Sequence, residues 1–243
     1  MNIEITTDYN ELSIKAAKKV ADYINSNPNK LVCFAAGNTP LGMLRELVTI
    51  QDRGEVDLST VYYAALDEWV GLGLDDAGSC VKVMTDVFYQ PAGIPKKMIH
   101  LFNGLDKNTD RQCREMERWL SSHGGIGFTL LGIGMNGHIG LNEPGTPETE
   151  GCLSVPLADI TKLVSFKYFG RELPITTGIT IGLRTLLGAC TVVLLASGSA
   201  KAPIIKSSLQ GPITLSVPAS LFQKHENIFA MLDKKAASLL ERL

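Results

Sequence analysis

A glycine-rich stretch in the second half of the chain combines residue types that could transfer protons. The segment GIGMNGHIGLNEPG, residues 132–145, contains Asn136, His138 and Glu143. A lone histidine in a loop is more often structural or merely exposed. A histidine flanked by a carboxylate and an amide, among glycines that let the backbone approach a ligand, is a better general acid/base candidate. The spacing of these side chains matches no zinc or two-metal pattern, so we expect no metal ion.

The same stretch also has the glycine spacing of a dinucleotide-binding loop. Gly132, Gly134 and Gly137 form G-x-G-x-x-G. Such a loop should open a helix after its third glycine, and it normally follows the first strand. Here the prolines of HIGLNEPGTPE prevent a helix, and four predicted strands precede or end at the stretch. Asp159 has the spacing of a ribose-binding acid, but chance supplies an acid there easily. We therefore expect no nicotinamide cofactor.

An acidic pair follows the buried run TVYYAAL, residues 60–66. Asp67 and Glu68 are adjacent, and neighbouring residues on an extended segment point to opposite sides. One carboxylate can therefore face a pocket while the other faces away. Desolvation raises the pKa of a carboxylate at such a strand end, which suits a general base. Acidic pairs are also common in turns and at helix starts, so the pair alone indicates little.

Two strand-to-helix junctions could bind a phosphate group. Gly37, Asn38 and Thr39 lie before a helix start, where free backbone N–H groups and the helix dipole attract anions. The alternative is a simple N-cap by Thr39. In ASGSAKAP, Ser199 is a candidate N-cap and Lys201 falls in the first helical turn. A lysine there opposes the helix dipole unless an anion lies between them, which favours a phosphate role over a solvated surface lysine.

These segments are connected by alternating helices and strands. Helices are expected over 10–26, 39–54, 79–89, 107–123 and 199–210, and strands over 31–37, 60–66, 98–102, 126–134, 191–198 and 227–233. The alternation predicts one α/β domain over residues 1–243. It has a Rossmann-like, mostly parallel sheet flanked by helices and small antiparallel additions in the 145–175 region. Ligands bind such sheets beyond the carboxyl ends of the strands, where the strand order reverses, so we expect the polar segments to meet there.

Composition limits the partners and the compartment. The chain has a net charge of -2, and its Lys and Arg residues are scattered, which argues against nucleic acid as a partner. No stretch reaches the roughly 18 consecutive apolar residues of a membrane span, and the polar N-terminus is unlike a secretory signal. Five widely spaced cysteines without a C-x-x-C pair indicate reduced thiols. We expect a cytoplasmic protein with no membrane partner.

Together the motifs resemble a known family, the glucosamine-6-phosphate deaminases/isomerases, which share a fold with 6-phosphogluconolactonases. The matching segments are GNTPLGMLREL, LDEWVGL, LGIGMNGHIGLNEPG, TTGITIGLRTLL and SGSAKA, and they cover nearly the whole chain in order. The N-E-P element is the specific one, because lactonases of this fold lack it. The segments GRELPITTGITIGL and PASLFQKHENIFAMLD look more like the galactosamine-6-phosphate branch. The preferred C4 epimer stays open.

The resemblance implies a reaction without a cofactor. A hexosamine 6-phosphate is opened at its ring, isomerised from aldose to ketose and stripped of ammonia, giving tagatose 6-phosphate or fructose 6-phosphate. By position, Asp67 would be the base that moves the proton between C2 and C1. His138 would shuttle the proton in ring opening, and Glu143 would orient His138 and tune its charge.

The resemblance also implies how the phosphate is bound. The loop 37–39 and Lys201 would hold it, with Lys167 standing where the family often has an arginine. Asn38 replaces a second glycine that is common in the family. Because asparagine tolerates left-handed backbone better than most residues, we expect phosphate binding to be intact.

Two further departures bear on mechanism and assembly. Asn136 stands where many members have aspartate, so His138 should be less basic here and depend more on Glu143. The chain ends at Leu243, without the longer C-terminal segment of allosteric hexameric members. We therefore expect no such allosteric site, and a monomer or small homo-oligomer.

Two other functions fit parts of the pattern. The fold also serves as the sugar-phosphate-sensing domain of some transcription regulators, which bind without turnover. The chain has no helix-turn-helix extension, and it keeps Asp67, His138 and Glu143 together, which argues against a sensor. A 6-phosphogluconolactonase would use the same fold, but the N-E-P element argues against it.

Overall fold

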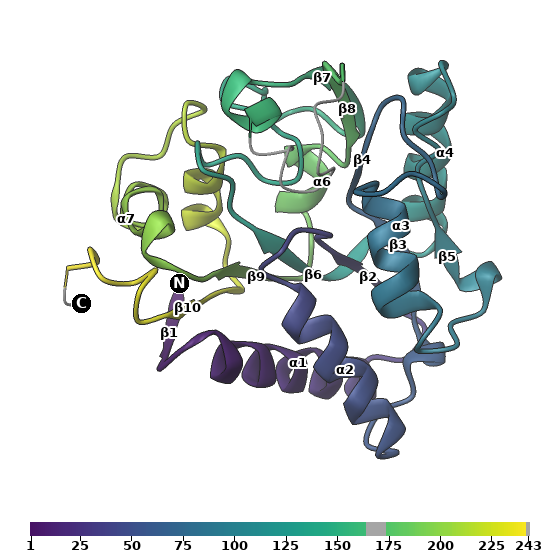
Figure 1. Ribbon diagram of the computed structural model, residues 1–243, viewed down its shortest axis with the longest axis horizontal. Helices are drawn as coiled ribbons and strands as arrows, with labels where there is room; N and C mark the ends of the chain where they lie inside the picture. The colour runs from purple at the N-terminus through teal and green to yellow at the C-terminus, as the bar shows by residue number, and fades with distance from the viewer. Residues whose placement is uncertain (164–173, 242–243) are drawn as a thin grey trace.

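The computed structural model describes residues 1–163 and 174–241. Within these residues, the main sheet has seven parallel strands in the order β1-β10-β9-β6-β2-β3-β5 (Figure 1). The strands are β1 (Asn2–Thr6), β2 (Leu31–Phe34), β3 (Tyr62–Ala65), β5 (Ile99–His100), β6 (Ile126–Gly132), β9 (Thr191–Ala196) and β10 (Ile228–Asp233). The predicted Rossmann-like, mostly parallel sheet is confirmed.

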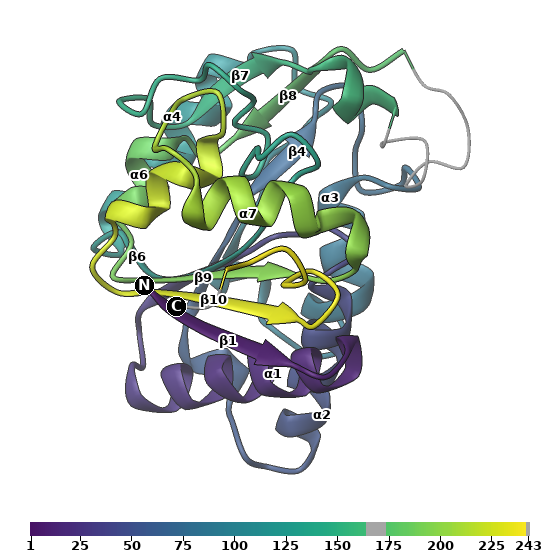
Figure 2. The same ribbon diagram turned by 90° about the vertical axis from the view of Figure 1, so that its left-hand side faces the viewer.

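Helices cover both faces of this sheet (Figures 1 and 2). Helices α1 (Tyr9–Ser26) and α2 (Leu41–Asp52) lie on one face, and α4 (Thr109–Ser122), α6 (Leu183–Leu187) and α7 (Ala202–Gln210) lie on the other. Strand β2 shows how the sequence supports both layers. Its Val32 and Phe34 pack into the core under α1 and α2, while Leu31 and Cys33 pack into the opposite core. All four are buried, as the continuous apolar run predicts.

A second, antiparallel sheet lies on the same side as α6 and α7 (Figure 2). Its strands are β4 (Asp67–Trp69), β8 (Thr177–Thr180) and β7 (Leu153–Pro156), in that order. The prediction of antiparallel additions over 145–175 is therefore confirmed for β7, whereas β8 lies just beyond that range. Strand β4 was not expected. The chain leaves β3, passes through Leu66 and enters the small sheet directly, so Asp67 lies at the junction of the two sheets.

Several elements differ from the sequence-based boundaries. Strand β1 was not predicted, although its NIEIT sequence alternates polar and apolar residues as strands do. It is an edge strand that pairs with β10. The helix expected over 79–89 consists of α3 (Cys80–Met84) and a π-helical turn, η2 (Thr85–Tyr89). Short 3₁₀ segments complete the connections: η1 (Leu58–Thr60), η3 (Lys96–Met98), η4 (Ser199–Lys201) and η5 (Pro218–Lys224).

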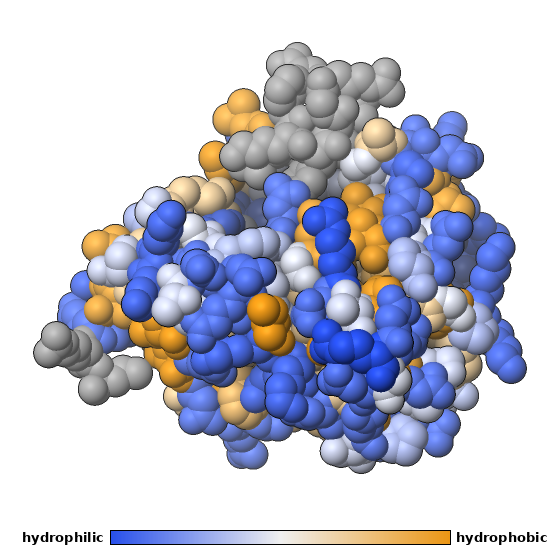
Figure 3. Space-filling view, turned by 60° about the horizontal axis from the view of Figure 1, so that its bottom comes forward, coloured by the Kyte–Doolittle hydropathy of each residue, from blue (hydrophilic) through white to orange (hydrophobic). Residues whose placement is uncertain are grey.

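The surface in Figure 3 is mostly hydrophilic, and its hydrophobic residues are exposed in small groups. Small groups of this kind are normal on a protein surface. Among the described residues, no helix is both long and apolar enough to cross a membrane.

The strand order reverses at β2. The next strand along the chain, β3, lies on one side of β2, and the later strand β6 lies on its other side. In open parallel sheets this arrangement leaves a crevice beyond the carboxyl ends of the strands at the reversal. The segments that follow β2, β3 and β6 therefore lie next to one another at this edge of the sheet.

Candidate active site

A cavity of about 250 Å³ lies at this reversal. Its walls come from residues 35–40 after β2, from Leu66 and Asp67 after β3, and from the glycine-rich segment after β6. Lys201, after β9, also lines it. All four polar segments singled out in the sequence thus contribute to one cavity, as the position of the strand reversal predicts.

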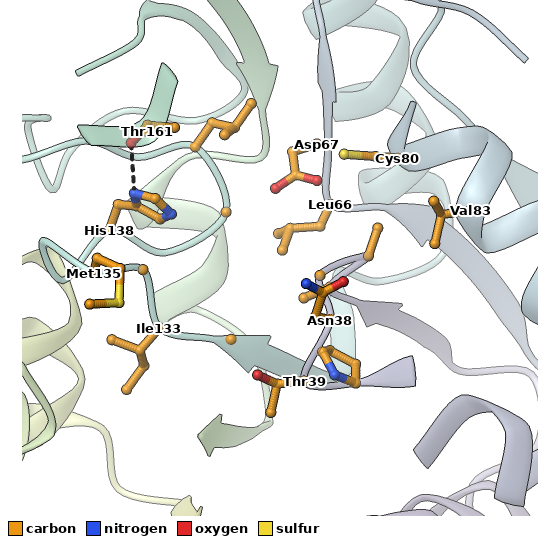
Figure 4. A pocket seen from close by; sticks show the side chains of 18 of the residues that line it. Asn38, Thr39, Leu66, Asp67, Cys80, Val83, Ile133, Met135, His138 and Thr161 are labelled. Carbon is orange, nitrogen blue, oxygen red and sulfur yellow. Dashed lines mark hydrogen bonds between the residues drawn. The ribbon is translucent and has the colours of Figure 1, made fainter. Parts of the chain in front are cut away.

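Asp67 is the carboxylate that enters the cavity. It is the first residue of β4, its side chain points into the open space, and only 8% of the residue is exposed (Figure 4). Burial raises the pKa of Asp67 to about 7; an interaction with the Cys80 thiol opposes this rise, and the nearby charge of Glu68 adds to it. A carboxylate with a pKa near neutrality is suited to accept a proton at physiological pH.

Glu68 is directed away from the cavity, as the alternation along an extended segment predicts. It is fully buried, and its oxygens accept hydrogen bonds from the backbone N–H groups of Trp69, Cys80 and Val81 at 2.8–3.0 Å. The Ser79 hydroxyl adds a fourth at 2.6 Å. Burial raises the pKa of Glu68, while these four bonds act in the opposite direction. Glu68 therefore fixes the start of α3 to β4 and does not face a ligand.

His138 lies across the cavity from Asp67 (Figure 4). Its Nδ1 is 3.3 Å from Oγ1 of Thr161 and 3.5 Å from Oε2 of Glu143. These two partners hold one edge of the imidazole, so the opposite nitrogen, Nε2, faces the cavity. Thr161 was not identified from the sequence. It lies 23 positions after His138, and nothing in the glycine-rich segment indicates this contact.

Asn136 and Glu143 form the support behind His138. Oε2 of Glu143 accepts a hydrogen bond from Nδ2 of Asn136 at 2.8 Å, and its Oε1 accepts one from the Ala158 backbone at 3.2 Å. Oδ1 of Asn136 accepts a hydrogen bond from the His138 backbone N–H at 3.2 Å. Burial acts to raise the pKa of Glu143, but the hydrogen bonds of His138, Thr161 and Asn136 lower it to about 2. Glu143 is therefore ionised at neutral pH.

Glycines in this loop make room for His138 itself. A Cβ atom on Gly134 would lie 2.3–2.4 Å from three atoms of the imidazole ring. Gly140 has φ of +58°, and a Cβ there would lie 2.7 Å from Oγ1 of Thr180. We expected these glycines to make room for a ligand. At Gly134 the space that a side chain would take is filled by the imidazole ring of His138.

The first phosphate-binding candidate is the loop 37–39, which lines the cavity opposite the glycine-rich segment. Tyr9, at the start of α1, holds this loop in place. Its hydroxyl donates a hydrogen bond to the Asn38 carbonyl at 3.2 Å and accepts one from the Gly42 N–H at 2.8 Å. Asn38 and Thr39 lie together at the cavity wall (Figure 4). Tyr9 was not identified from the sequence, where it lies just before the helix expected over 10–26.

Two sequence-based expectations about this loop are corrected. Thr39 does not cap α2: the cap position is Pro40, and no side chain accepts a hydrogen bond there. Asn38 does not need the left-handed backbone conformation attributed to it, because the non-glycine residue with positive φ in the described parts of the chain is Asn29. Asparagine in place of glycine therefore causes no backbone strain at position 38.

Lys201 lies at the end of η4, immediately before α7, so the predicted lysine at a helix N-terminus is present. Its Nζ donates a hydrogen bond to the Ile133 carbonyl, which ties it to the segment that follows β6. The expected cap by Ser199 is wrong: Gly198 occupies the cap position, with φ of +93° and no side-chain hydrogen bond.

Asp233 supports the Lys201 turn and was not identified from the sequence. It ends β10 and is almost fully buried. Its carboxylate accepts hydrogen bonds from the Ser197 hydroxyl at 2.5 Å, from the Gly198 N–H at 3.1 Å and from the Ala236 N–H at 2.7 Å. An acid at the carboxyl end of the strand NIFAMLD is the only signal that could have indicated it.

A second phosphate-binding cation and the absence of a metal ion were also predicted. Lys167 lies outside the described residues. Within residues 1–163 and 174–241, no group of three or more His, Cys, Asp or Glu side chains is placed to hold a metal ion. The side chains that line the cavity include a carboxylate, an imidazole, an ammonium group, a thiol and hydroxyls.

Known proteins are similar to this chain over nearly its full length. The family model for glucosamine-6-phosphate isomerases/6-phosphogluconolactonase matches residues 8–230. A glucosamine-6-phosphate deaminase of Thermoanaerobacter sp. (strain X514) is 38% identical, covering 99% of this chain and 95% of its own. One from Clostridium perfringens (strain ATCC 13124) is 35% identical, with 99% and 100% covered.

Solved structures give the same result. A monomeric glucosamine-6-phosphate deaminase, described as a missing link of the NagB superfamily, is 33% identical with a TM-score of 0.95, over 99% of this chain and all of that one. The 6-phosphogluconolactonase of Trypanosoma brucei has a TM-score of 0.78 at 19% identity, over 99% and 98% of the two chains, and shares the fold. The chain belongs to the glucosamine-6-phosphate isomerase/6-phosphogluconolactonase family.

Proposed function

We propose that this protein is a hexosamine-6-phosphate deaminase/isomerase. It opens the ring of an amino-sugar 6-phosphate, moves a proton from C2 to C1 and releases the amine as ammonia with consumption of one water. The observation that carries the proposal is the buried carboxylate of Asp67, with a pKa of about 7, facing His138 across one cavity. The full-length relatives named glucosamine-6-phosphate deaminases support it.

Asp67 has the properties that the proton transfer needs. The proton on C2, next to the C1 carbonyl of the open sugar, is weakly acidic, and a base with a pKa near 7 removes it best at neutral pH. Proton-transfer groups of this kind typically contribute about 10²–10⁴-fold to the rate. The resulting Asp67 carboxyl then returns the proton to C1, which completes the aldose-to-ketose conversion.

His138 serves the ring-opening step. Its Nδ1 edge is held by Thr161 and Glu143, so Nε2 is the nitrogen that exchanges a proton with the sugar ring oxygen. The ionised Glu143 stabilises the imidazolium when His138 carries the proton. The fixed ring orientation keeps Nε2 directed at the substrate during both transfers.

The phosphate supplies binding energy away from the reacting carbons. The loop 37–39 and Lys201 line the cavity and offer backbone N–H groups, a hydroxyl and an ammonium group. Binding energy from a remote group of this kind positions C1 and C2 between Asp67 and His138. Lys167 is proposed as an additional phosphate ligand on the basis of the family resemblance.

The epimer at C4 is the finer part of the proposal. The curated relatives are named for glucosamine 6-phosphate, whereas the segments GRELPITTGITIGL and PASLFQKHENIFAMLD resemble the galactosamine branch. One hydroxyl separates the two substrates, and a site built to hydrogen-bond a hydroxyl can discriminate strongly. We propose galactosamine 6-phosphate as the preferred substrate and glucosamine 6-phosphate as the alternative.

A side-by-side assay of ammonia release tests the function. Purified protein is given each hexosamine 6-phosphate, and kcat/KM is compared between the two epimers. Release from either one supports the deaminase, and the larger value identifies the epimer. The Asp67→Asn variant should lose turnover by at least about 10²-fold while still binding the sugar phosphate.

Two results would refute the proposal. Thermal stabilisation by both sugar phosphates without any ammonia release indicates a sensor. Hydrolysis of 6-phosphogluconolactone without activity on either amine indicates a lactonase. We expect a monomer or small homo-oligomer in the cytoplasm, which sedimentation and cell fractionation test separately.

A further inference from the structure

A thiol lies beside the proposed base. Cys80 is the first residue of α3, lines the cavity, and its sulfur is next to the Asp67 carboxylate (Figure 4). This neighbouring thiol acts to lower the pKa of Asp67, against the effect of burial. Thirteen positions separate the residues in sequence, and the sequence reading treated this cysteine only as one of five scattered thiols.

The backbone of Cys80 is fixed relative to Asp67. Its N–H donates to Oε1 of Glu68 at 3.0 Å, and Val81 donates to Oε2 of the same carboxylate at 2.8 Å. Glu68 is covalently adjacent to Asp67, so one fully buried carboxylate ties the start of α3 to the base. The backbone that carries the thiol is therefore held beside Asp67.

The thiol of Cys80 remains protonated. Burial raises its pKa well above the usual range, and the negative charges of Asp67 and Glu68 raise it further. A protonated thiol can donate a hydrogen bond, although it is a weaker donor than a hydroxyl. A thiolate nucleophile needs a lowered pKa and a positive neighbour, and this environment provides the opposite.

We propose that Cys80 is a positioning residue for the base: its S–H donates to Asp67, favours the ionised carboxylate and directs it into the cavity toward His138. The proposal rests on the proposed function of Asp67. It assigns to Cys80 a role in proton abstraction without direct contact with the reacting carbons.

Other titratable groups surround Asp67, and a test of the Cys80 thiol must leave them unchanged. Glu68 is adjacent on β4, and the fully buried Cys33 approaches from β2. His138 lies across the cavity from it, and Lys201 also lines this cavity. A substitution at Cys80 leaves all four in place, so a change in the titration of Asp67 can be attributed to the thiol.

The test compares two substitutions of similar size. Cys80→Val fills the volume of the sulfur with methyl groups and removes the donor, so no water is needed to fill a void. Cys80→Ser keeps a donor. For Cys80→Val we expect the acid limb of the kcat/KM–pH profile to move up by about half to one pH unit, lowering kcat/KM below the limb about three- to tenfold. Cys80→Ser should keep the limb at or below its wild-type position.

A matched control and a second readout separate this proposal from a structural effect. Cys113→Val, in the buried face of α4 outside the cavity, should change stability without moving the limb. The protonated-carboxyl infrared band that Asp67→Asn removes reports the titration of Asp67 directly, even in a protein that releases no ammonia. If the Asp67 midpoint of folded Cys80→Val equals that of the wild type, or falls below it, the role of Cys80 is refuted. That result leaves the deaminase function standing.

Discussion

At the scale of single residues, Asn136 places an amide, and not a second carboxylate, behind His138. The amide uses both of its ends: Oδ1 accepts from the His138 backbone, and Nδ2 donates to Glu143. An aspartate could accept from the same backbone N–H, but it would face the ionised Glu143 with a second negative charge. Asn136 therefore stabilises the Glu143 carboxylate and adds no negative charge of its own.

We predict that Asn136→Asp makes His138 more basic and the protein less stable. The added carboxylate favours the imidazolium, so the His138 midpoint followed by NMR of its ring protons should rise. The lost Nδ2 donor and the repulsion from Glu143 should lower the free energy of unfolding at pH 7 by about 1–3 kcal/mol. The exposed acid at Asp159 provides a control, since Asp159→Asn should leave both values unchanged. An unchanged or lower His138 midpoint in folded Asn136→Asp would contradict the prediction.

At the scale of elements, the end of β10 positions the turn that carries Lys201. Asp233 accepts hydrogen bonds from Ser197 and Gly198, which lie between β9 and the turn, and from Ala236 beyond its own strand. The parallel pairing of β9 with β10 brings these groups together. Lys201 thus depends on an acid 32 positions further along the chain.

Loosening this turn should weaken phosphate binding more than catalysis. For Asp233→Ala we expect KM for the sugar phosphate to rise about tenfold with a smaller change in kcat, because Asp67 and His138 are held by other elements. Steady-state kinetics measure KM and kcat, at a pH above the acid limb of the kcat/KM–pH profile, where Asp67 is ionised. Asp110→Ala, in the first turn of α4, is the control for losing an acid elsewhere. An equal fall in kcat with KM unchanged would show that Asp233 acts on the chemistry and not on the phosphate.

The elements also show where sequence reasoning succeeds. Helical spacing of apolar residues predicted α1, and continuous apolar runs predicted β2 and β6. Alternation along an extended segment correctly placed Asp67 and Glu68 on opposite sides. Sequence reasoning missed β1, a five-residue edge strand, and β4, which is too short to show a pattern. Contacts such as those of Tyr9, Thr161 and Asp233 with the site arise from the fold, because their partners are distant in sequence.

At the scale of the whole molecule, the site is assembled where two sheets and the strand reversal meet. Asp67 begins the antiparallel sheet, His138 follows the central strand β6, and both face one cavity. The fold keeps a carboxylate in a place where its charge is poorly solvated. Such placements cost stability and are characteristic of functional sites.

The cost should appear in the pH dependence of stability. The pKa of Asp67 rises from 3.8 in an exposed aspartate to about 7 in the folded protein. Between these values the folded state holds a proton that the unfolded state has released, so this group lowers stability as pH increases from about 4 to about 7. Asp67→Asn removes the effect. Its free energy of unfolding relative to wild type should grow over that range and level off above pH 7 at no more than about 4 kcal/mol.

Glu143, in the support behind the same cavity, provides the contrast that isolates the charge effect. Its pKa is lowered to about 2 in the folded state, so its carboxylate stabilises the protein at neutral pH and loses this contribution as pH falls toward 2. Glu143→Gln should therefore be less stable than wild type at pH 7, with the difference shrinking in acid, which is the opposite trend to Asp67→Asn. Urea unfolding of the three proteins between pH 2 and 8 measures both trends. Parallel trends for the two variants would mean that lost packing, and not the ionisation of Asp67 and Glu143, sets their stability.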